Sequence, residues 1–117
     1  MTTLMAAQIE HARSLPFKEG VWKIVETIPE GYVLGYGHIA ALSGFPNRAR
    51  QAGFALSKMP PNTSAPWWRV IRSDGSIPNH GAQNKNDAHA LILKSENVSF
   101  KGSRVNMVVS KWNPTLL

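Results

Sequence analysis

The sequence predicts a single domain over residues 1–117 that is mainly α-helical with short β-strands and has a helix-turn-helix or winged-helix-like fold. The chain has 117 residues, which leaves room for one compact unit. Apolar residues recur at helical spacing in several segments, and proline and glycine separate these segments. A hydrophobic share of 43% with 17% charged residues is typical of a chain that buries a core.

Two helices are expected before residue 31. The first lies within the first dozen residues, and Pro16 begins the second. The second helix should end at the Ile-Pro-Glu-Gly run at 28–31, because proline disfavours a helical residue before it and glycine adopts turn angles. Its apolar residues fall on one helical face, at i, i+4, i+7, i+8 and i+11: Phe17, Val21, Ile24, Val25 and Ile28.

A helix-turn-helix is predicted next. A short helical stretch at 38–43, a Gly-Phe-Pro break at 44–46 and a helix from 47 to about 58 match the pattern. One side of the second helix has small packing residues: Ala49, Ala52, Gly53 and Leu56. The other side is rich in hydrogen-bond donors and suits the groove and phosphates of DNA: Asn47, Arg50, Gln51, Phe54 and Lys58. An ordinary surface helix is the alternative, although such a helix would more often include acidic residues.

The second half of the chain is predicted to contain a helix and two hairpins. The Ser-Asp-Gly-Ser run at 73–76 is typical of a turn, so its flanks are expected to pair as a small hairpin. Apolar residues at 98–100 and 105–109 surround Lys-Gly-Ser and predict a second hairpin or a wing. The helix is expected from Asn84 to about Ser95, with four residues facing inward: Ala88, Leu91, Ile92 and Ser95.

Positive charge is concentrated in the middle of the chain. The net charge is +6 and the isoelectric point is about 10.1. Residues 31–73 contain no Asp or Glu but five basic residues: Arg48, Arg50, Lys58, Arg69 and Arg72. An acid-free stretch of this length indicates a polyanionic partner such as nucleic acid. A basic surface that only keeps the protein in solution is the alternative.

Several kinds of site are not expected. The absence of cysteine excludes disulfides, thiolate zinc sites, iron–sulfur clusters and cysteine nucleophiles. No glycine-rich phosphate loop and no Ser/His/acid arrangement is recognisable, so neither a cofactor nor catalysis is predicted. No apolar run or signal peptide indicates a membrane, so a cytoplasmic location is expected. No metal site is predicted, because none of the histidines has a second ligand at i+3 or i+4: His11, His38, His80 and His89.

The Pro-Trp-Trp-Arg run at 66–69 is the most unusual motif. It lies within the basic stretch, where a loop is expected to lead into a strand. Adjacent side chains of an extended chain point to opposite sides, so one indole can enter the core while the other lines a pocket. Trp67 directly follows the proline and is assigned to the pocket, while a structural role is favoured for Trp68.

Four runs together resemble a known family: Ile-Pro-Glu-Gly at 28–31, Tyr-Gly-His-Ile-Ala at 36–40, Arg-Ala-Arg-Gln-Ala-Gly-Phe-Ala at 48–55, and Pro-Trp-Trp-Arg-Val-Ile at 66–71 with Asp-Gly at 74–75. Their order and spacing, over about residues 15–100, are similar to those of the DNA-binding domain of the O6-alkylguanine-DNA alkyltransferases. That family's signature is Pro-Cys-His-Arg-Val, in which the cysteine accepts an alkyl group from a flipped guanine. With Trp67 at the cysteine position and Trp68 at the histidine position, the chain resembles the alkyltransferase-like branch, which binds alkylated guanine without repairing it.

The resemblance implies roles for residues on the helix-turn-helix. Tyr36 matches the tyrosine that pushes on the phosphate 3′ to the lesion. Arg50 matches the arginine finger, which enters through the minor groove and fills the gap left by the flipped base. Gln51 and Lys58, on the same helix side, are expected to contact the DNA as well.

The resemblance also implies a lesion pocket and two departures from the family. The pocket is expected to be formed by one run of residues: Pro66, Trp67, Trp68 and Arg69. Glu96 matches the acid of the family's Cys-His-Glu relay, but here it has no thiol or histidine to act on, so a structural role is expected. Met59 lies at the position where the family usually has the asparagine of an Asn-Pro turn. The loop that follows is therefore expected to be held by different contacts.

By this resemblance the chain is a non-enzymatic sensor of O6-alkylguanine in duplex DNA that flips the damaged base and directs it to nucleotide excision repair proteins. It is expected to act as a monomer. Flipping costs a few kcal/mol, less for a damaged base, and stacking on an indole can return about 1–3 kcal/mol. Two alternatives remain: a residual DNA repair enzyme that uses water instead of cysteine, and a winged-helix regulator that reads sequence.

Overall fold

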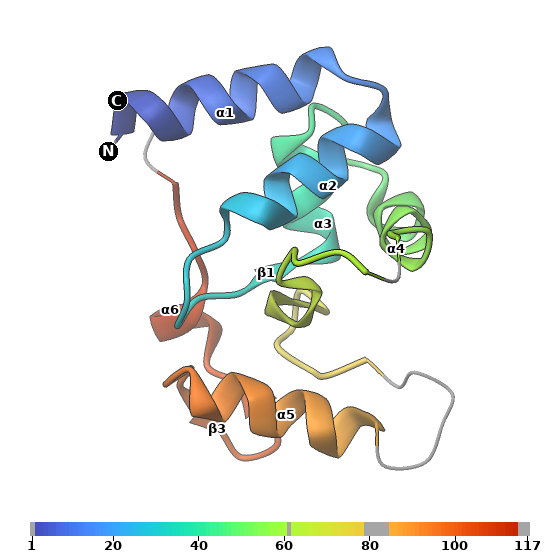
Figure 1. Cartoon of the computed structure of the whole chain (residues 1–117). Helices are drawn as coiled ribbons and strands as arrows, with labels where there is room; N and C mark the ends of the chain where they lie inside the picture. The colour runs from blue at the N-terminus through green and yellow to red at the C-terminus, as the bar shows by residue number, and fades with distance from the viewer. Residues whose placement is uncertain (1, 61, 79–84, 115–117) are drawn as a thin grey trace.

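The computed structural model describes residues 2–60, 62–78 and 85–114 and confirms a mainly helical fold with short strands (Figure 1). In chain order its elements are α1 (Thr2–Ser14), α2 (Phe17–Thr27), β1 (Leu34–Gly35), α3 (Tyr36–Leu42), α4 (Ala49–Ser57), the 3-10 helix η1 (Trp67–Arg69), β2 (Val70–Ile71), α5 (Lys85–Ser95), β3 (Phe100–Lys101), β4 (Arg104–Val105) and α6 (Met107–Ser110). No helix within these ranges is long and apolar enough to cross a membrane.

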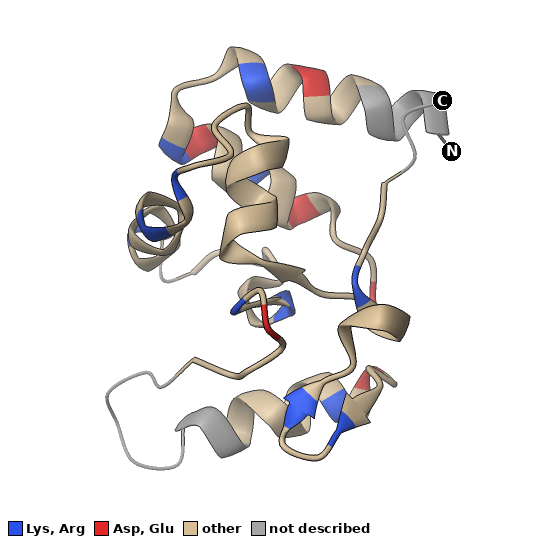
Figure 2. Ribbon diagram, turned by 180° about the vertical axis from the view of Figure 1, so that it is seen from behind, with Lys and Arg blue, Asp and Glu red and all other residues tan. Residues whose placement is uncertain are grey.

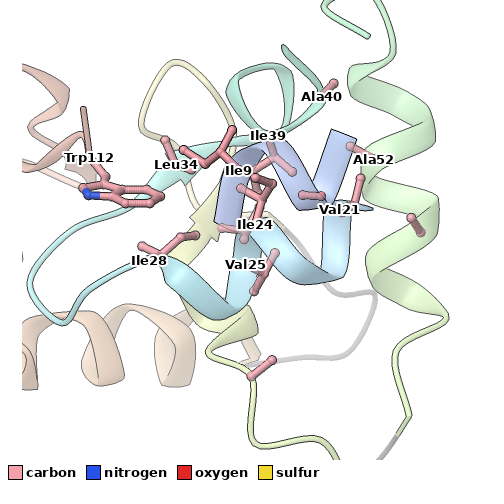
Figure 3. Close-up of a cluster of buried hydrophobic side chains, with 14 residues drawn as sticks. Ile9, Val21, Ile24, Val25, Ile28, Leu34, Ile39, Ala40, Ala52 and Trp112 are labelled. Atoms are coloured by element: carbon pink, nitrogen blue, oxygen red, sulfur yellow. The ribbon is translucent and has the colours of Figure 1, made fainter. Parts of the chain in front are cut away.

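Helices α1 to α4 surround the larger of two cores. The expected apolar face of α2 is confirmed: Val21, Ile24, Val25 and Ile28 are at most 2% exposed, and Phe17 packs at the edge. Figure 3 shows the four buried side chains meeting others from α1, β1, α3, α4 and the C-terminal segment. Gly20 lets α1 and α2 approach closely, because a Cβ there would lie 2.5 Å from the carbonyl oxygen of Ala12.

The predicted helix-turn-helix is formed by α3 and α4. The nitrogen of Gly35 donates to Nδ1 of His38 (3.0 Å), which fixes the first turn of α3. Burial and the nearby Lys111 ammonium lower the pKa of His38, so its ring stays neutral and can accept this bond. The turn after α3 passes through Gly44 at φ +98°, a left-handed conformation that favours glycine. Trp22 Nε1 donates to the Ala55 carbonyl (2.8 Å) and fastens α4 to α2.

The prediction of a hairpin around residues 73–76 is wrong. The turn exists, but β2 pairs in parallel with β1, with Leu34 opposite Val70 and Gly35 opposite Ile71. Both residues of each strand are buried, and strands covered on both faces favour an interior pairing over an exposed hairpin. Gly35 lets β1 approach the chain just after β2 closely, since a Cβ on Gly35 would lie 2.5 Å from Ser73 Oγ.

The inward face predicted for α5 is also wrong. Leu91 and Ile92 are 67% and 36% exposed, and Ala88 and Ser95 are exposed as well. The buried stripe instead contains His89 (1% exposed) and Leu93 (0%). A search for apolar residues at helical spacing does not find this stripe, because a histidine occupies one of its core positions. With Leu93, a smaller core forms from Val33, Ile71, Val98 and Val105.

The C-terminal part contains the expected hairpin and one further helix. Strands β3 and β4 pair antiparallel around Gly102, which has φ +67°. Residues 107–109, expected to belong to this hairpin or wing, instead lie in α6, where the Asn106 side chain accepts a hydrogen bond from the Val108 nitrogen (3.1 Å). The chain then returns to β1: Val33 bridges to Lys111, and Trp112 enters the larger core.

Candidate nucleic-acid interface

Helix α4 presents the donor-rich side that the sequence predicted. Its inner residues Ala52 and Ala55 are buried. The outer residues are all exposed, and we call them the α4 face: Arg50, Gln51, Phe54 and Lys58. Figure 2 shows acidic segments on α1 and α2 but none on α4. This face therefore offers cations, an amide and an aromatic ring with no acidic residue among them.

Tyr36 lies directly behind α4. Gly53 of α4 faces the Tyr36 ring: a Cβ on Gly53 would lie 3.7 Å from two ring atoms, an ordinary van der Waals distance. Burial raises the pKa of the Tyr36 hydroxyl, against the opposing effect of the Arg72 cation. The hydroxyl is therefore protonated at neutral pH and can donate a hydrogen bond to a phosphate oxygen.

A hollow of about 210 Å³ separates α4 from η1. This volume is below the roughly 300–1,000 Å³ of pockets that hold drug-sized ligands, so the hollow suits a small group such as a single heterocyclic base. The hollow brings together residues from four elements, α3, α4, η1 and β2: Tyr36, Gly53, Leu56, Ser57, Trp67 and Val70.

Trp67 forms one wall of this hollow and is 41% exposed. The two tryptophans lie in a 3-10 helix rather than in the expected extended chain, so strand alternation does not separate them. Their rings instead meet edge to face at 5.9 Å, and the His89 ring contacts Trp67 at 5.3 Å. His89 Nε2 donates to the Trp68 carbonyl (2.6 Å). The Trp67 ring is thus in edge contact with Trp68 and His89, and the hydrogen bond from His89 to the Trp68 carbonyl ties these two neighbours together.

Arg69 and Glu96 form a partly buried ion pair beside the tryptophans. Arg69 donates to Glu96 from Nε (2.9 Å) and Nη2 (2.7 Å), and to the Ile28 carbonyl from Nη1 (2.8 Å). Trp68 Nε1 donates to the same carboxylate (3.0 Å). The Arg69 hydrogen bonds hold the pKa of Glu96 below its ordinary value, although burial opposes this. The hydrogen bond to Glu96 likewise raises the pKa of Arg69.

The predicted pocket residues therefore separate into two groups. Trp67 lines the hollow together with Tyr36, whereas Arg69 directs its guanidinium to Glu96 and Ile28, and Trp68 points its indole nitrogen to Glu96. Pro66 is buried. The structural role expected for Glu96 agrees with its three hydrogen bonds.

Sequence reasoning missed His89, which contacts both tryptophans. The signal that could have found it is the spacing of His89, Leu93 and Glu96 at i, i+4 and i+7, which is one helical face. The described residues contain no group of three or more His, Asp or Glu side chains that could hold a metal ion, and His80 lies outside these residues.

The profile of the family described as 6-O-methylguanine DNA methyltransferase, DNA binding domain, matches residues 16–98. The chain belongs to this family. It is 38% identical over 97 residues to a DNA base-flipping protein of Escherichia coli, covering 83% of this chain and 74% of the relative. It is 36% identical over 103 residues to Alkyltransferase-like protein 1 of Schizosaccharomyces pombe, covering 84% and 95% of the two chains.

Solved structures of family members have the same fold. The S. pombe alkyltransferase-like protein, crystallised with damaged DNA containing O6-carboxymethylguanine, superposes with a TM-score of 0.74 at 34% identity, over 84% of this chain and 95% of that chain. The Mycobacterium tuberculosis O6-methylguanine methyltransferase gives a TM-score of 0.60 at 33% identity, over 70% and 48%. Because this chain has no cysteine, it is an alkyltransferase-like member that cannot accept an alkyl group on a cysteine sulfur.

Proposed function

We propose that this protein recognises O6-alkylguanine in duplex DNA by flipping the damaged base into the hollow, and that it leaves the alkyl group in place. The observation that carries the proposal is a base-sized hollow between Tyr36 and Trp67, beside an exposed arginine, in a family member without cysteine. The similarity to a base-flipping protein and to a protein crystallised with damaged DNA supports it.

The α4 face supplies the contact with the duplex. Arg50 enters the base stack and fills the gap that the flipped nucleotide leaves, while Gln51 and Lys58 bind the backbone beside it. The basic residues provide affinity that does not depend on sequence. The Tyr36 hydroxyl donates a hydrogen bond to the phosphate next to the flipped nucleotide and stabilises the rotated conformation of the DNA backbone.

Trp67 takes the position of the family's cysteine and offers an aromatic face to the flipped base. Stacking of a base on an aromatic side chain contributes about 1–3 kcal/mol, which is comparable to the few kcal/mol that flipping costs. An alkylated guanine pairs poorly, so its flipping costs less than that of guanine. The difference gives selectivity for the lesion without any chemical step.

Persistent binding implies a downstream partner. The bound protein cannot remove the alkyl group through a cysteine, so removal requires a system that excises the damaged nucleotide. We propose that one protein molecule marks the lesion for nucleotide excision repair proteins, which would recognise the protein together with the distorted DNA.

A binding titration tests the proposal. Two duplexes that differ only in guanine or O6-methylguanine at one position are titrated with protein at a fixed ionic strength of about 0.15 M. We expect affinity for the alkylated duplex to be higher by about tenfold or more, which is ~1.4 kcal/mol. Mass spectrometry after long incubation should find the alkylated strand intact. Equal affinities, or a cleaved or dealkylated strand, would contradict the proposal.

A further inference from the structure

Phe54 is the member of the α4 face that the proposed function leaves without a role. Its side chain is 65% exposed, whereas its helix neighbours Ala52 and Ala55 are 0% and 4% exposed. The helix is thus firmly packed, and Phe54 projects from it into solvent. A single exposed apolar residue is common on proteins, so exposure alone does not assign a function.

The surroundings of Phe54 are cationic. Arg50 precedes it by four residues and Lys58 follows it by four, so all three lie along one helix side. The Lys58 ammonium lies 5.0 Å from the ring centroid, within the range of a cation–π contact. An apolar ring between two cations matches a DNA groove, in which stacked bases lie between two lines of phosphates.

Phe54 also lies beside the hollow. Its chain neighbour Gly53 and Ser57, one turn further on, both line the hollow. Ser57 Oγ donates to the Phe54 carbonyl (2.6 Å), which ties the two residues together. Four residues of helix rise by about 6 Å, close to two base steps of ~3.4 Å. Arg50 and Phe54 can therefore reach the same short stretch of stacked bases.

We propose that Phe54 is a second, apolar wedge that enters the minor groove and unstacks a base step next to the flipped nucleotide. Aromatic and aliphatic side chains of minor-groove proteins kink duplexes in this way. On binding, the Lys58 ammonium leaves the ring and pairs with a phosphate, so the aromatic face becomes available to the bases. This inference rests on the proposed function only in that α4 faces the duplex.

The test compares Phe54→Ala with a matched control, Val109→Ala. Val109 is 61% exposed and lies on α6, on the opposite side of the molecule from α4 (Figure 1). Neither change should shift the thermal unfolding midpoint by much, since both side chains are largely in water. The probes are an O6-methylguanine duplex and its guanine counterpart, each with 2-aminopurine one or two pairs from the target position. Its fluorescence rises when the base unstacks.

We expect Phe54→Ala to weaken binding to the alkylated duplex by about tenfold and to remove the 2-aminopurine signal of the parent protein. The slope of affinity against salt should stay unchanged, because no phosphate contact is lost, whereas Lys58→Ala should reduce it by about one. Phe54→Leu should keep part of the affinity, and Val109→Ala should keep all of it.

The failure of this inference can be told apart from failure of the proposed function. If the parent protein does not distinguish the two duplexes, the proposed function fails. Phe54 is then judged on the guanine duplex alone, where lost affinity still supports a DNA contact. If Phe54→Ala binds both duplexes as the parent does and keeps the 2-aminopurine signal, the wedge is refuted. Phe54 would then be an exposed apolar side chain with no part in binding DNA.

Discussion

Replacing Glu96 with glutamine would remove the negative charge that holds Arg69 and Trp68 in place. The carboxylate accepts three hydrogen bonds of 2.7–3.0 Å, and the Arg69 and Glu96 side chains are only 14% and 11% exposed. A fully buried pair costs about 3–5 kcal/mol to break from one side, and an exposed pair about 0–1 kcal/mol. Because glutamine can still accept through its amide oxygen, we expect a loss of about 2–3 kcal/mol of unfolding free energy.

Urea unfolding followed by circular dichroism measures this loss. The matched control is Glu26→Gln, which breaks the exposed Lys23–Glu26 pair at 3.5 Å, with side chains 45% and 51% exposed. The control should lose less than about 0.5 kcal/mol. A Glu96→Gln variant as stable as the control would refute the view that the ion pair supports the tryptophan wall.

The same ion pair predicts how stability depends on pH. The folded protein holds the pKa of Glu96 below its unfolded value, mainly through the Arg69 hydrogen bonds. The carboxylate therefore contributes its full stability above the unfolded pKa of about 4.3, and this contribution is lost as the pH falls through the lower folded pKa. Glu96→Gln should flatten the acid limb of the unfolding free energy against pH. An unchanged acid limb would contradict the assignment.

Three further substitutions test the interface. Arg50→Ala should lower affinity for an O6-methylguanine duplex by about tenfold or more while leaving the unfolding midpoint unchanged, and anisotropy titration measures this. Tyr36→Ala should reduce flipping, read from a fluorescent base analogue at the lesion position, more than it reduces duplex affinity. Trp67→Cys should transfer methyl groups slowly or not at all, since a free thiol is only a few per cent thiolate at pH 7 and the Trp68 indole cannot accept its proton. Mass spectrometry would show the added methyl, and rapid transfer before Trp68→His is added would contradict this reasoning.

The first four helices were predictable because local signals there agree with the fold. The α2 stripe is purely apolar, Pro16 and Pro29 bound it, and α3 and α4 are separated by glycine and proline. The pairing of β2 was not predictable, because a two-residue strand contains no information about a partner 36 positions earlier. The turn at 73–76 favoured a hairpin locally, and burial on both faces of β2 overrode that preference.

The site was predictable in outline but not in detail. Residue types and order predicted roles for Tyr36, Arg50 and Trp67, and the structure places Tyr36 and Trp67 at the hollow and Arg50 on the exposed α4 face. The direction of the Arg69 side chain was not accessible, because it depends on Glu96, 27 residues away, and on a carbonyl at the end of α2. The buried stripe of α5 was missed because it contains a histidine, and the burial of that ring depends on a hydrogen bond to a distant backbone oxygen.

The parallel pairing of β1 with β2 makes the segment from α3 to η1 a closed loop, with its two ends held side by side. Closing a loop of about 36 residues costs about 3 kcal/mol of chain entropy, and four residues of ladder cannot recover that alone. We therefore expect the two strands to pair late in folding, after α3 and α4 have packed on α2. Their buried backbone amides should exchange with solvent only through global unfolding. The helix-turn-helix would thus assemble before the two strands at its ends pair.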